Sequence, residues 1–312
     1  MCLWGKCGSL AAKLTIPSRE ARTTMDLEQK AIGRIKLASQ MPLQHYGKPL
    51  ICTYSGGKDS DVMLELFIRS GVPFEAHHSH TTVDAPPTVY HIRDKFKKLE
   101  GKGIKCTIQK PRMTMWELIP YKMIPPTQIV RYCCKELKEN SIKNRMIATG
   151  VRWDESNQRK SRDILEAIGA TKKDATVVSD EMMLMNDNSN KRRLIERCEL
   201  KAKTVCNPII DWRNTDIWDY IRSEKMIYNY LYDRGYSRVG CVGCPMVGKK
   251  RRKQFADFPT YERAYKRSFK VMLQKLIDKG KDPRWKNEEE VFDWWMQNGN
   301  IPGQMSIENY IN

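Results

Sequence analysis

The spacing of apolar residues alternates along the chain between the period of a helix and the run of a buried strand. Leu27, Ala31, Ile35 and Ala38 recur at helical spacing over residues 25–41, which predicts an opening helix. Strands are expected next at 49–54, 74–79, 104–109 and 147–151, with helices between them at 59–69, 86–99 and 135–146. A strand followed by a helix, repeated at least three times, predicts an α/β fold with a parallel sheet covered on both faces.

The pattern changes in the second half of the chain. It blurs between residues 161 and 206, where the polar stretch 186–193 is expected to be a surface loop. Helical spacing returns at 216–221, 261–276 and 288–296, in segments rich in Trp and Tyr. We therefore expect three regions: an N-terminal extension and helix (1–47), an α/β domain (48–245) and a basic, aromatic helical region (246–312).

Composition adds a strong positive charge to this picture. The 312 residues carry 55 Lys and Arg against 37 Asp and Glu, a formal net charge of +18, which favours an anionic partner. No uncharged apolar run approaches the ~18 residues that a bilayer span needs, so we expect no membrane segment. Lys6 and two glycines interrupt the first eleven residues where a secretory signal needs an apolar centre, so we expect a cytoplasmic protein.

Residues Ser55-Gly56-Gly57-Lys58-Asp59-Ser60 form the turn between the first strand and the next helix. Two glycines allow a sharp turn with exposed backbone N–H groups, and a helix N-terminus adds partial positive charge. The hydroxyls of Ser55 and Ser60 and the Lys58 ammonium supply further donors. The turn therefore predicts an oligophosphate site, although it differs from the P-loop of kinases because Asp59 stands where that motif has Ser or Thr. The alternative is a glycine turn in which Ser55 or Asp59 only caps a helix.

Several segments together carry a family resemblance. Ser55–Ser60 resembles the PP-loop of the N-type ATP pyrophosphatases, which cleave ATP between the α and β phosphates. The segments Thr81–Asp84, Gly150–Arg152 with Glu155, Ser156 and Arg159, and Asn207–Trp212 with Asp216–Ile221 are similar, in the same order, to motifs of the phosphoadenosine phosphosulfate (PAPS) reductase family. The resemblance covers residues 48–245. It implies a fold of the adenine-nucleotide α-hydrolase type with a C-terminal helical region.

The same resemblance implies roles for individual residues. The loop Ser55–Ser60 would hold phosphate or sulfate oxygens of ATP or an adenylyl nucleotide. Arg152 and Arg159 would clamp a second anionic group, and Asp84 would bind ribose or Mg²⁺. The expected nucleotide site therefore consists of Ser55, Gly56, Gly57, Lys58, Asp59, Ser60, Asp84, Gly150, Arg152, Glu155, Ser156 and Arg159.

Four of the ten cysteines form two close pairs, Cys133-Cys134 and Cys241-x-x-Cys244. Four thiolates suit zinc or an iron–sulfur cluster, and buried free thiols or a disulfide are the remaining alternatives. Adjacent cysteines strain the tetrahedron of zinc, whereas the iron corners of a cubane lie farther apart. The pattern also resembles the [4Fe–4S] ligand set of bacterial adenylyl-sulfate reductases and of the ATP-pyrophosphatase component of DNA phosphorothioation systems.

Two features bear on the reaction. Reductases of this family use a nucleophilic cysteine in a C-terminal tail, and no cysteine follows Cys244 here, so the catalytic nucleophile stays unassigned. A basic run, Lys249-Lys250-Arg251-Arg252-Lys253, predicts an anionic partner such as nucleic acid, or else a solvated helix face. The aromatics that follow it, Phe258, Tyr261, Tyr265 and Phe269, have core spacing.

Three functions follow as expectations. The first is an ATP pyrophosphatase or adenylating enzyme with a [4Fe–4S] cluster that serves sulfur transfer. The second is an adenylyl-sulfate or PAPS reductase supplied with electrons by a thioredoxin-like donor. The third is a non-catalytic iron–sulfur module that binds nucleotide or nucleic acid. A donor protein for sulfur or electrons and a homo-oligomer are the other partners expected.

Overall fold

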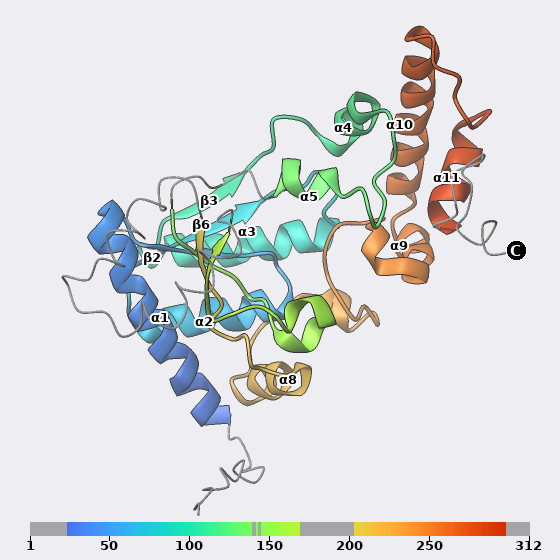
Figure 1. The fold of residues 1–312 in the computed structure, drawn as a ribbon. Helices are drawn as coiled ribbons and strands as arrows, with labels where there is room; N and C mark the ends of the chain where they lie inside the picture. The colour runs from blue at the N-terminus through green and yellow to red at the C-terminus, as the bar shows by residue number, and fades with distance from the viewer. Residues whose placement is uncertain (1–23, 139–141, 143–144, 169–202, 298–312) are drawn as a thin grey trace, which may run out of the picture.

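The computed structural model describes residues 24–138, 142, 145–168 and 203–297, and its centre is a six-stranded sheet (Figure 1). The strands are β1 (Leu50–Thr53), β2 (Phe74–Ser79), β3 (Cys106–Gln109), β4 (Ile147–Ala148), β5 (Leu165–Ile168) and β6 (Lys203–Cys206), in the order β3-β2-β1-β4-β6-β5. All neighbours are parallel except β5, which pairs antiparallel with β6 at the edge. The predicted α/β class with a parallel sheet is therefore confirmed, with one antiparallel strand that the blurred sequence pattern did not predict.

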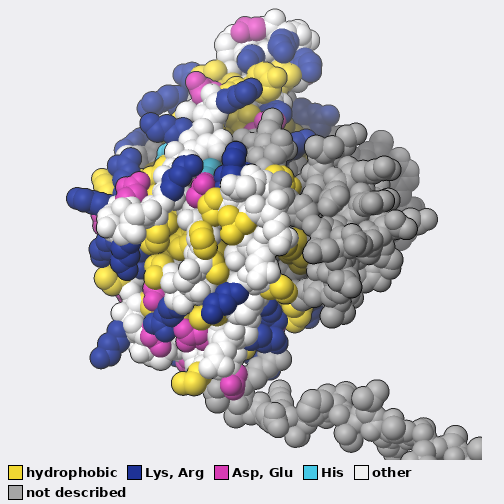
Figure 2. Space-filling model, turned by 90° about the vertical axis from the view of Figure 1, so that its left-hand side faces the viewer, with side chains coloured by type: hydrophobic (Ala, Val, Ile, Leu, Met, Phe, Trp, Pro, Cys, Tyr) yellow, Lys and Arg dark blue, Asp and Glu magenta, His cyan; other side chains and the backbone are white. Residues whose placement is uncertain are grey.

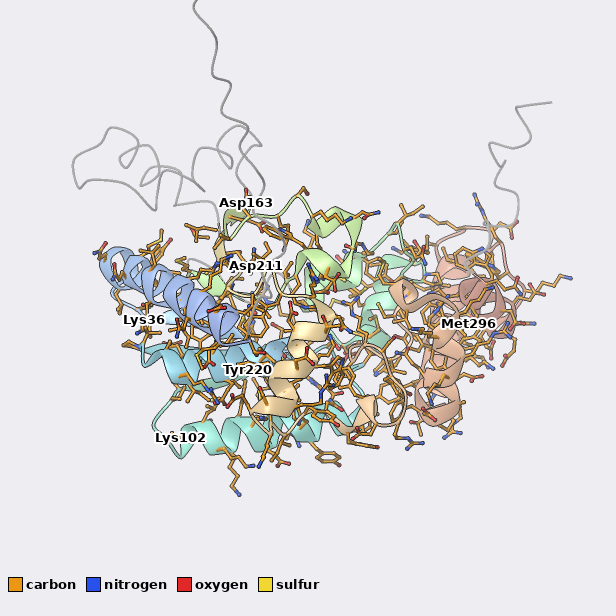
Figure 3. All side chains as sticks on the ribbon, turned by 90° about the horizontal axis from the view of Figure 1, so that it is seen from below. Lys36, Lys102, Asp163, Asp211, Tyr220 and Met296 are labelled. Carbon is orange, nitrogen blue, oxygen red and sulfur yellow. The ribbon has the colours of Figure 1, made fainter. Side chains whose placement is uncertain are left out.

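Helices cover the sheet as the alternating pattern predicts. The first group comprises α1 (Thr24–Tyr46), α2 (Lys58–Ser70), α3 (Pro86–Glu100) and α8 (Asn214–Ser223). Buried side chains from α1, α2, α3 and α8 meet those of the strands in one cluster, here called the sheet core, which includes Ile35, Leu50, Phe67 and Trp212. Asp211 joins α1 to this body, because the Arg34 guanidinium donates to both of its carboxylate oxygens at 2.6 and 3.1 Å (Figure 3).

A second apolar cluster lies under the remaining helices. These are α4 (Met115–Lys122), α5 (Tyr132–Leu137), α9 (Arg251–Asp257), α10 (Pro259–Asp278) and α11 (Glu288–Gln297). Helix α10 packs against α4 and α11, and Phe255, Tyr265, Phe269 and Trp295 stack ring against ring. We call this cluster the helical core. Figure 3 shows these helices at the opposite end of the molecule from α1, near the labelled Met296.

Most predicted element positions are confirmed. The expected helices near the C-terminal end match α8, α10 and α11, and the expected strand at 74–79 matches β2 residue for residue. The helix expected over 135–146 is described only as α5, which begins earlier, at Tyr132, and ends at Leu137. Helix α4 was not predicted, because its eight residues include Pro120. The surface loop expected at 186–193 lies outside the described residues.

None of the helices in the described part of the chain has the length and apolar character that crossing a bilayer requires.

Candidate functional site

The loop Ser55–Ser60 lies between β1 and α2, at the edge of the sheet where the parallel strands end. Gly56 has a φ of +73°, which favours glycine, and a Cβ there would come within 2.9 Å of Ile92 Cγ1 and 3.0 Å of Thr88 Cγ2. Gly57 is extended and precedes the first residue of α2, Lys58. The two glycines therefore have separate roles: one turns the chain against α3, and the other brings the N-terminus of α2 to the loop.

The serines of the loop hold it closed from within. The Ser60 hydroxyl donates to the Gly57 carbonyl at 2.7 Å and accepts from the Ser55 amide at 3.3 Å. The Ser55 hydroxyl lies 3.2 Å from the Ser60 hydroxyl. The sequence predicted both hydroxyls as donors to a ligand. In the structure both also form hydrogen bonds that fix the shape of the loop.

Two residues from a distant segment brace the same loop. The Tyr232 hydroxyl accepts from the Lys58 amide at 3.0 Å, and the buried Asn229 side chain donates to the Gly56 carbonyl at 3.2 Å and the Thr88 hydroxyl at 3.1 Å. Burial raises the pKa of Tyr232 above its usual range, although the hydrogen bond from Lys58 opposes that shift, so the phenol stays neutral and able to accept. The loop is therefore held in one conformation by segment 229–232.

Lys58 and Arg152 place two largely buried cations beside the loop. The Lys58 ammonium lies 3.0 Å from Asp59 Oδ2, and Arg152 Nε donates to Asp59 Oδ1 at 2.7 Å. Arg152 Nη1 donates to the Trp212 carbonyl at 3.2 Å, which fixes the direction of the guanidinium. Gly150 allows this approach, because a Cβ at that position would lie 3.3 Å from the Asp59 backbone. The predicted residues Lys58, Asp59, Gly150 and Arg152 therefore meet at one place.

Arg159 lies in a second positive region. It forms an ion pair with Glu155, while Ser156 is exposed beside them. Burial lowers the pKa of Arg159, and the neighbouring charges of Arg238 and Arg162 lower it further. Three guanidinium groups lie together here against two paired carboxylates, Glu155 and Glu166, and this excess of positive charge favours the binding of an anion. Arg238 was not predicted as a site residue.

Asp84 connects the end of β2 to the cysteine region. Its backbone forms an isolated antiparallel bridge with Cys241, and its carbonyl accepts from the Tyr261 hydroxyl at 2.7 Å. Burial raises the pKa of the Asp84 carboxyl, but His80 and the Thr81 amide, which donates at 2.8 Å, outweigh it and lower the pKa to about 2. Asp84 is therefore ionised at neutral pH although it is buried.

The two cysteine pairs lie close together. Cys133 and Cys134 lie in the first turn of α5. The pKa of the Cys133 thiol is raised by a hydrogen bond with Cys134, by burial, and by the charges of Cys241 and Cys244. Burial raises the pKa of Cys241, whose thiol lies 3.4 Å from the Thr81 hydroxyl, and the nearby Lys138 ammonium opposes that shift. Two segments more than a hundred residues apart thus bring their thiols near enough to interact electrostatically. That the four thiols bind one metal group stays a prediction.

Gly243 explains the spacing of the second pair. It has a φ of +76°, and a Cβ would come within 2.7 Å of Phe255, 2.9 Å of Tyr265 and 3.1 Å of Trp295. Its amide donates to the Gln254 side chain at 2.9 Å. The turn between Cys241 and Cys244 is therefore pressed onto the aromatic rings of the helical core, and only glycine fits there.

The basic run is partly a surface feature. Four of its five side chains are exposed: Lys249, Lys250, Arg252 and Lys253. Arg251 is fully buried. It donates to the Trp295 carbonyl at 2.6 Å, and its guanidinium lies over the Trp295 ring. The prediction that Arg251 belongs to a surface patch is wrong, because that side chain anchors α9 to α11. Figure 2 shows other lysine and arginine side chains scattered over a different face, so the positive charge is spread over the molecule. The aromatics predicted as core, Phe258, Tyr261, Tyr265 and Phe269, do pack in the helical core.

The sequence did not reveal the residues that support the site through distant contacts. These are Asn229, Tyr232, Lys138 and Arg238, which reach the loop, the thiols or Arg159 from other segments. A lone Asn inside the apolar run 226–232 was the available signal for the first of them. Tyr232 belongs to the same run, and Lys138 and Arg238 are residue types that are common on surfaces.

Comparison with known proteins assigns the family. The model of the phosphoadenosine phosphosulfate reductase domain matches residues 49–247. The chain belongs to this family. The match spans the phosphate loop, Asp84, both cysteine pairs and Arg159, and it ends just before the basic run.

Individual relatives are distant. An uncharacterized protein of Methanocaldococcus jannaschii is 27% identical over 221 residues, which cover 70% of this chain and 40% of that protein. A second protein of the same organism is also 27% identical, over 46% of its own length, so the chain spans less than half of these two curated relatives. The adenosine 5'-phosphosulfate reductase of Geobacillus kaustophilus is 23% identical over 64% of this chain and 74% of the enzyme.

Solved structures give weak likenesses. The PAPS reductase of Candida auris, in a phosphate complex, aligns with a TM-score of 0.41 and 16% identity over 71% of this chain and 97% of that one. The U34-tRNA thiolase of Methanococcus maripaludis, solved with its [4Fe-4S] cluster, aligns with a TM-score of 0.41 and 12% identity over 90% of this chain and 86% of that one.

Proposed function

We propose that the protein is an ATP-dependent enzyme that adenylates an acceptor with release of pyrophosphate, and that it carries a [4Fe–4S] cluster for sulfur transfer. The observation that carries this proposal is the dual contact of segment 229–244. Asn229 and Tyr232 brace the phosphate loop, and Cys241 bridges to Asp84 and approaches the other thiols. A nucleotide on the loop and a cluster on the thiols would therefore occupy neighbouring parts of one site.

The roles of the loop residues follow from their geometry. The amides at the start of α2 and the cations of Lys58 and Arg152 would bind the β and γ phosphates, because fixed donors in a water-poor site stabilise the charge that grows on the leaving group. Arg159 would bind a further anionic group, and Asp84 would bind ribose or Mg²⁺. An acceptor nucleophile attacks the α phosphorus, the bond to the bridging oxygen breaks, and pyrophosphate leaves with the electron pair.

The four thiols suit an iron–sulfur cluster by their chemistry. Cys133, Cys134, Cys241 and Cys244 supply the four sulfur ligands that such a cluster takes, and aromatic rings of the helical core shield them on one side. When bound, the cluster would supply a place at which sulfur or electrons are handled. Lys138 would partly neutralise the negative charge of the deprotonated thiolates.

A true sulfonucleotide reductase is the second candidate. Its reaction needs a thiolate nucleophile, which attacks the sulfur of the sulfate group while the nucleotide phosphate leaves. The S-sulfocysteine that results is then reduced by a dithiol donor, which releases sulfite. Of the described cysteines outside the four, Cys106 and Cys206 have their pKa raised by burial to about 11 and about 12, and burial raises that of Cys52 further. These thiols are poor nucleophiles at neutral pH, which favours adenylation.

The acceptor is proposed from charge. Lys249, Lys250, Arg252 and Lys253 are exposed immediately after Cys244. Four exposed cations in the segment that follows the second thiol pair favour a polyanionic acceptor such as nucleic acid.

An anaerobic product assay tests the reaction. Protein with its iron retained is offered ATP, adenylyl sulfate and PAPS in parallel. Pyrophosphate from ATP supports adenylation, whereas sulfite from either sulfonucleotide supports the reductase. Nucleotide binding without any product would assign a non-catalytic module and overturn the proposal.

Two variants test the assignment of the loop. Lys58→Ala and Ser60→Ala should each weaken ATP binding and turnover at least tenfold, because each removes a donor at the loop. Arg222→Ala is the control, since its exposed side chain pairs with Asp219 on α8 and takes no part in the site. Unchanged affinity and turnover in both loop variants would reject the loop as the phosphate site. Iron and acid-labile sulfide analysis tests the cluster: one zinc and no sulfide per chain would replace it with a zinc site.

A further inference from the structure

His78, His80 and Asp84 bring three ligand atoms together between the phosphate loop and the thiols. The Nδ1 atom of His80 lies 3.2 Å from Asp84 Oδ2, and the Nε2 atom of His78 lies 4.0 Å from the same oxygen. All three ligand atoms lie within 4.8 Å of one another. The two histidines come from the end of β2 and the loop after it, and Asp84 follows four residues later.

His78 supplies the observation that points to a ligand. Its side chain is only 6% exposed, and its Nδ1 lies 2.9 Å from the Tyr54 carbonyl, which can only accept a hydrogen bond. Nδ1 therefore carries a proton, and in the neutral ring the lone pair of Nε2 points toward the Asp84 carboxylate. Nε2 is buried and has no hydrogen-bond partner. A lone pair that faces a carboxylate in a buried place is unfavourable unless a cation lies between them.

The arrangement has the features of a metal site. Metal-bound histidines commonly donate their second N–H to a backbone carbonyl, as His78 does to Tyr54. Asp84 is held in place by the Thr81 amide at 2.8 Å. Donors about 2.1 Å from a tetrahedral ion lie about 3.4 Å apart, so the separation of His80 and Asp84 already fits, and that of His78 and Asp84 closes with a small side-chain rotation.

We propose that His78, His80 and Asp84 bind one divalent transition-metal ion, with zinc as the best-suited ion. Two imidazole nitrogens and one carboxylate suit zinc and its neighbours in the first transition row, whereas Mg²⁺ prefers oxygen ligands alone. Three protein ligands leave a position open for water or for an oxygen of the substrate. Asp84, assigned above to ribose or Mg²⁺, would in this case serve a resident ion next to the phosphate loop.

The site is separate from the thiols but near them. Thr81 contacts both, because its amide donates to Asp84 and its hydroxyl lies 3.4 Å from Cys241 Sγ. Lys138 interacts with both as well. Thiol ligands compete for the same ions, so the experiment has to distinguish sulfur ligands from nitrogen and oxygen ligands.

Equilibrium dialysis of the iron-containing protein against Zn²⁺ tests the proposal, with zinc and iron measured in the same samples. Wild type should bind one zinc per chain more than His80→Gln, and the partly exposed side chain at this position makes the substitution mild for the fold. His78→Gln should lose the same zinc. The matched control is His77→Gln, the neighbour on β2 that points to the other face of the sheet, and it should bind as much zinc as wild type.

X-ray absorption at the zinc edge identifies the ligands. The account predicts nitrogen and oxygen neighbours for the zinc that His80→Gln loses. Equal zinc in wild type and His80→Gln, or sulfur as the neighbours of that zinc, would overturn the proposal. The result does not depend on the proposed reaction, because zinc binding is measured without nucleotide, so a protein that fails to turn over ATP can still pass this test.

Discussion

The phosphate loop and the thiol site are neighbours that are built in different ways. At the loop, Ser55, Ser60, Asn229 and Tyr232 bond to one another or to the backbone, and two buried cations share Asp59. At the thiol site the pKa values of Cys133 and Cys241 are raised, so both are protonated at neutral pH. The loop is complete before a ligand arrives, whereas the proposed metal group would complete the thiol site and displace the thiol protons.

The two sites lie in two halves of the molecule, one built on the sheet core and one on the helical core, and these halves are stabilised in different ways. The sheet core holds the loop through β1, α2 and α3, which pack without any cofactor. The helical core is held by aromatic rings around Gly243 and by the two cysteine segments, α5 and the turn 241–244. A metal group on the four thiols would cross-link those segments. A change at one site should therefore affect its own half of the molecule more than the other.

Removal of iron should have the largest effect. Structural zinc bound by thiolates contributes about 10–16 kcal/mol of apparent binding free energy, and part of that energy stabilises the fold. An iron–sulfur cluster on the four thiols should act in the same direction. After anaerobic chelation, amide hydrogen exchange should accelerate more than tenfold in α5, α9 and α10 and change little in β1 and α2. Equal acceleration in both halves would contradict the claim that a metal group stabilises the helical half alone. No acceleration anywhere would show that the thiols hold no structural metal group.

Gly243→Ala should be the most damaging substitution in the helical half. A positive φ costs alanine about 1–2 kcal/mol, and contacts with Phe255 and Tyr265 add about 1–3 kcal/mol of overpacking. Urea denaturation measures the loss, and iron content should fall with it. Gly280→Ala, just after α10, is the control: its φ is also positive, at +65°, but a Cβ there meets nothing within 4 Å. Equal losses of stability in the two variants would show that contact with the aromatic rings does not limit position 243 to glycine.

Gly56→Ala tests the loop half in the same way. The new Cβ would lie 2.9 Å from Ile92 Cγ1, so the loop must shift, and we expect about 2–3 kcal/mol of lost stability with ATP binding weakened at least tenfold. The control Gly71→Ala has a φ of +70° and open space around its Cβ. It should lose stability without losing affinity. Iron content should stay at the wild-type level in both variants.

Asp211→Asn should change how the stability of the sheet half depends on pH. Burial raises the pKa of Asp211, but Arg34 and Lys30 outweigh it and lower the pKa to about 2. Because the folded pKa is below the unfolded value, the stabilisation is full above pH ~4 and is lost as pH falls toward 2. The pKa shift corresponds to about 2 kcal/mol of stability at neutral pH. The difference in free energy of unfolding between wild type and the variant should therefore decrease by about 1 kcal/mol at pH ~3. Urea midpoints measure this, with Asp219→Asn as the exposed control, and a constant gap would reject the assignment.

The sequence predicted the positions of the local motifs better than the contacts that surround them. The loop Ser55–Ser60 and the cysteine pairs were recognisable because turns and ligand pairs are local in sequence. The antiparallel strand β5 and the role of Tyr232 were not, because both depend on contacts between segments far apart in the chain. Arg251 was misassigned for a related reason. A run of five basic residues does not show that one of them is buried, because its partner Trp295 is far away in the chain.

The most direct test of the central claim is electron paramagnetic resonance of the reduced protein with and without a non-hydrolysable ATP analogue. If nucleotide and cluster share the site formed by segment 229–244, the analogue should change the cluster signal in wild type. It should leave that signal unchanged in Lys58→Ala at the same concentration. A cluster signal that is the same with and without bound analogue, or no cluster signal at all, would contradict the account.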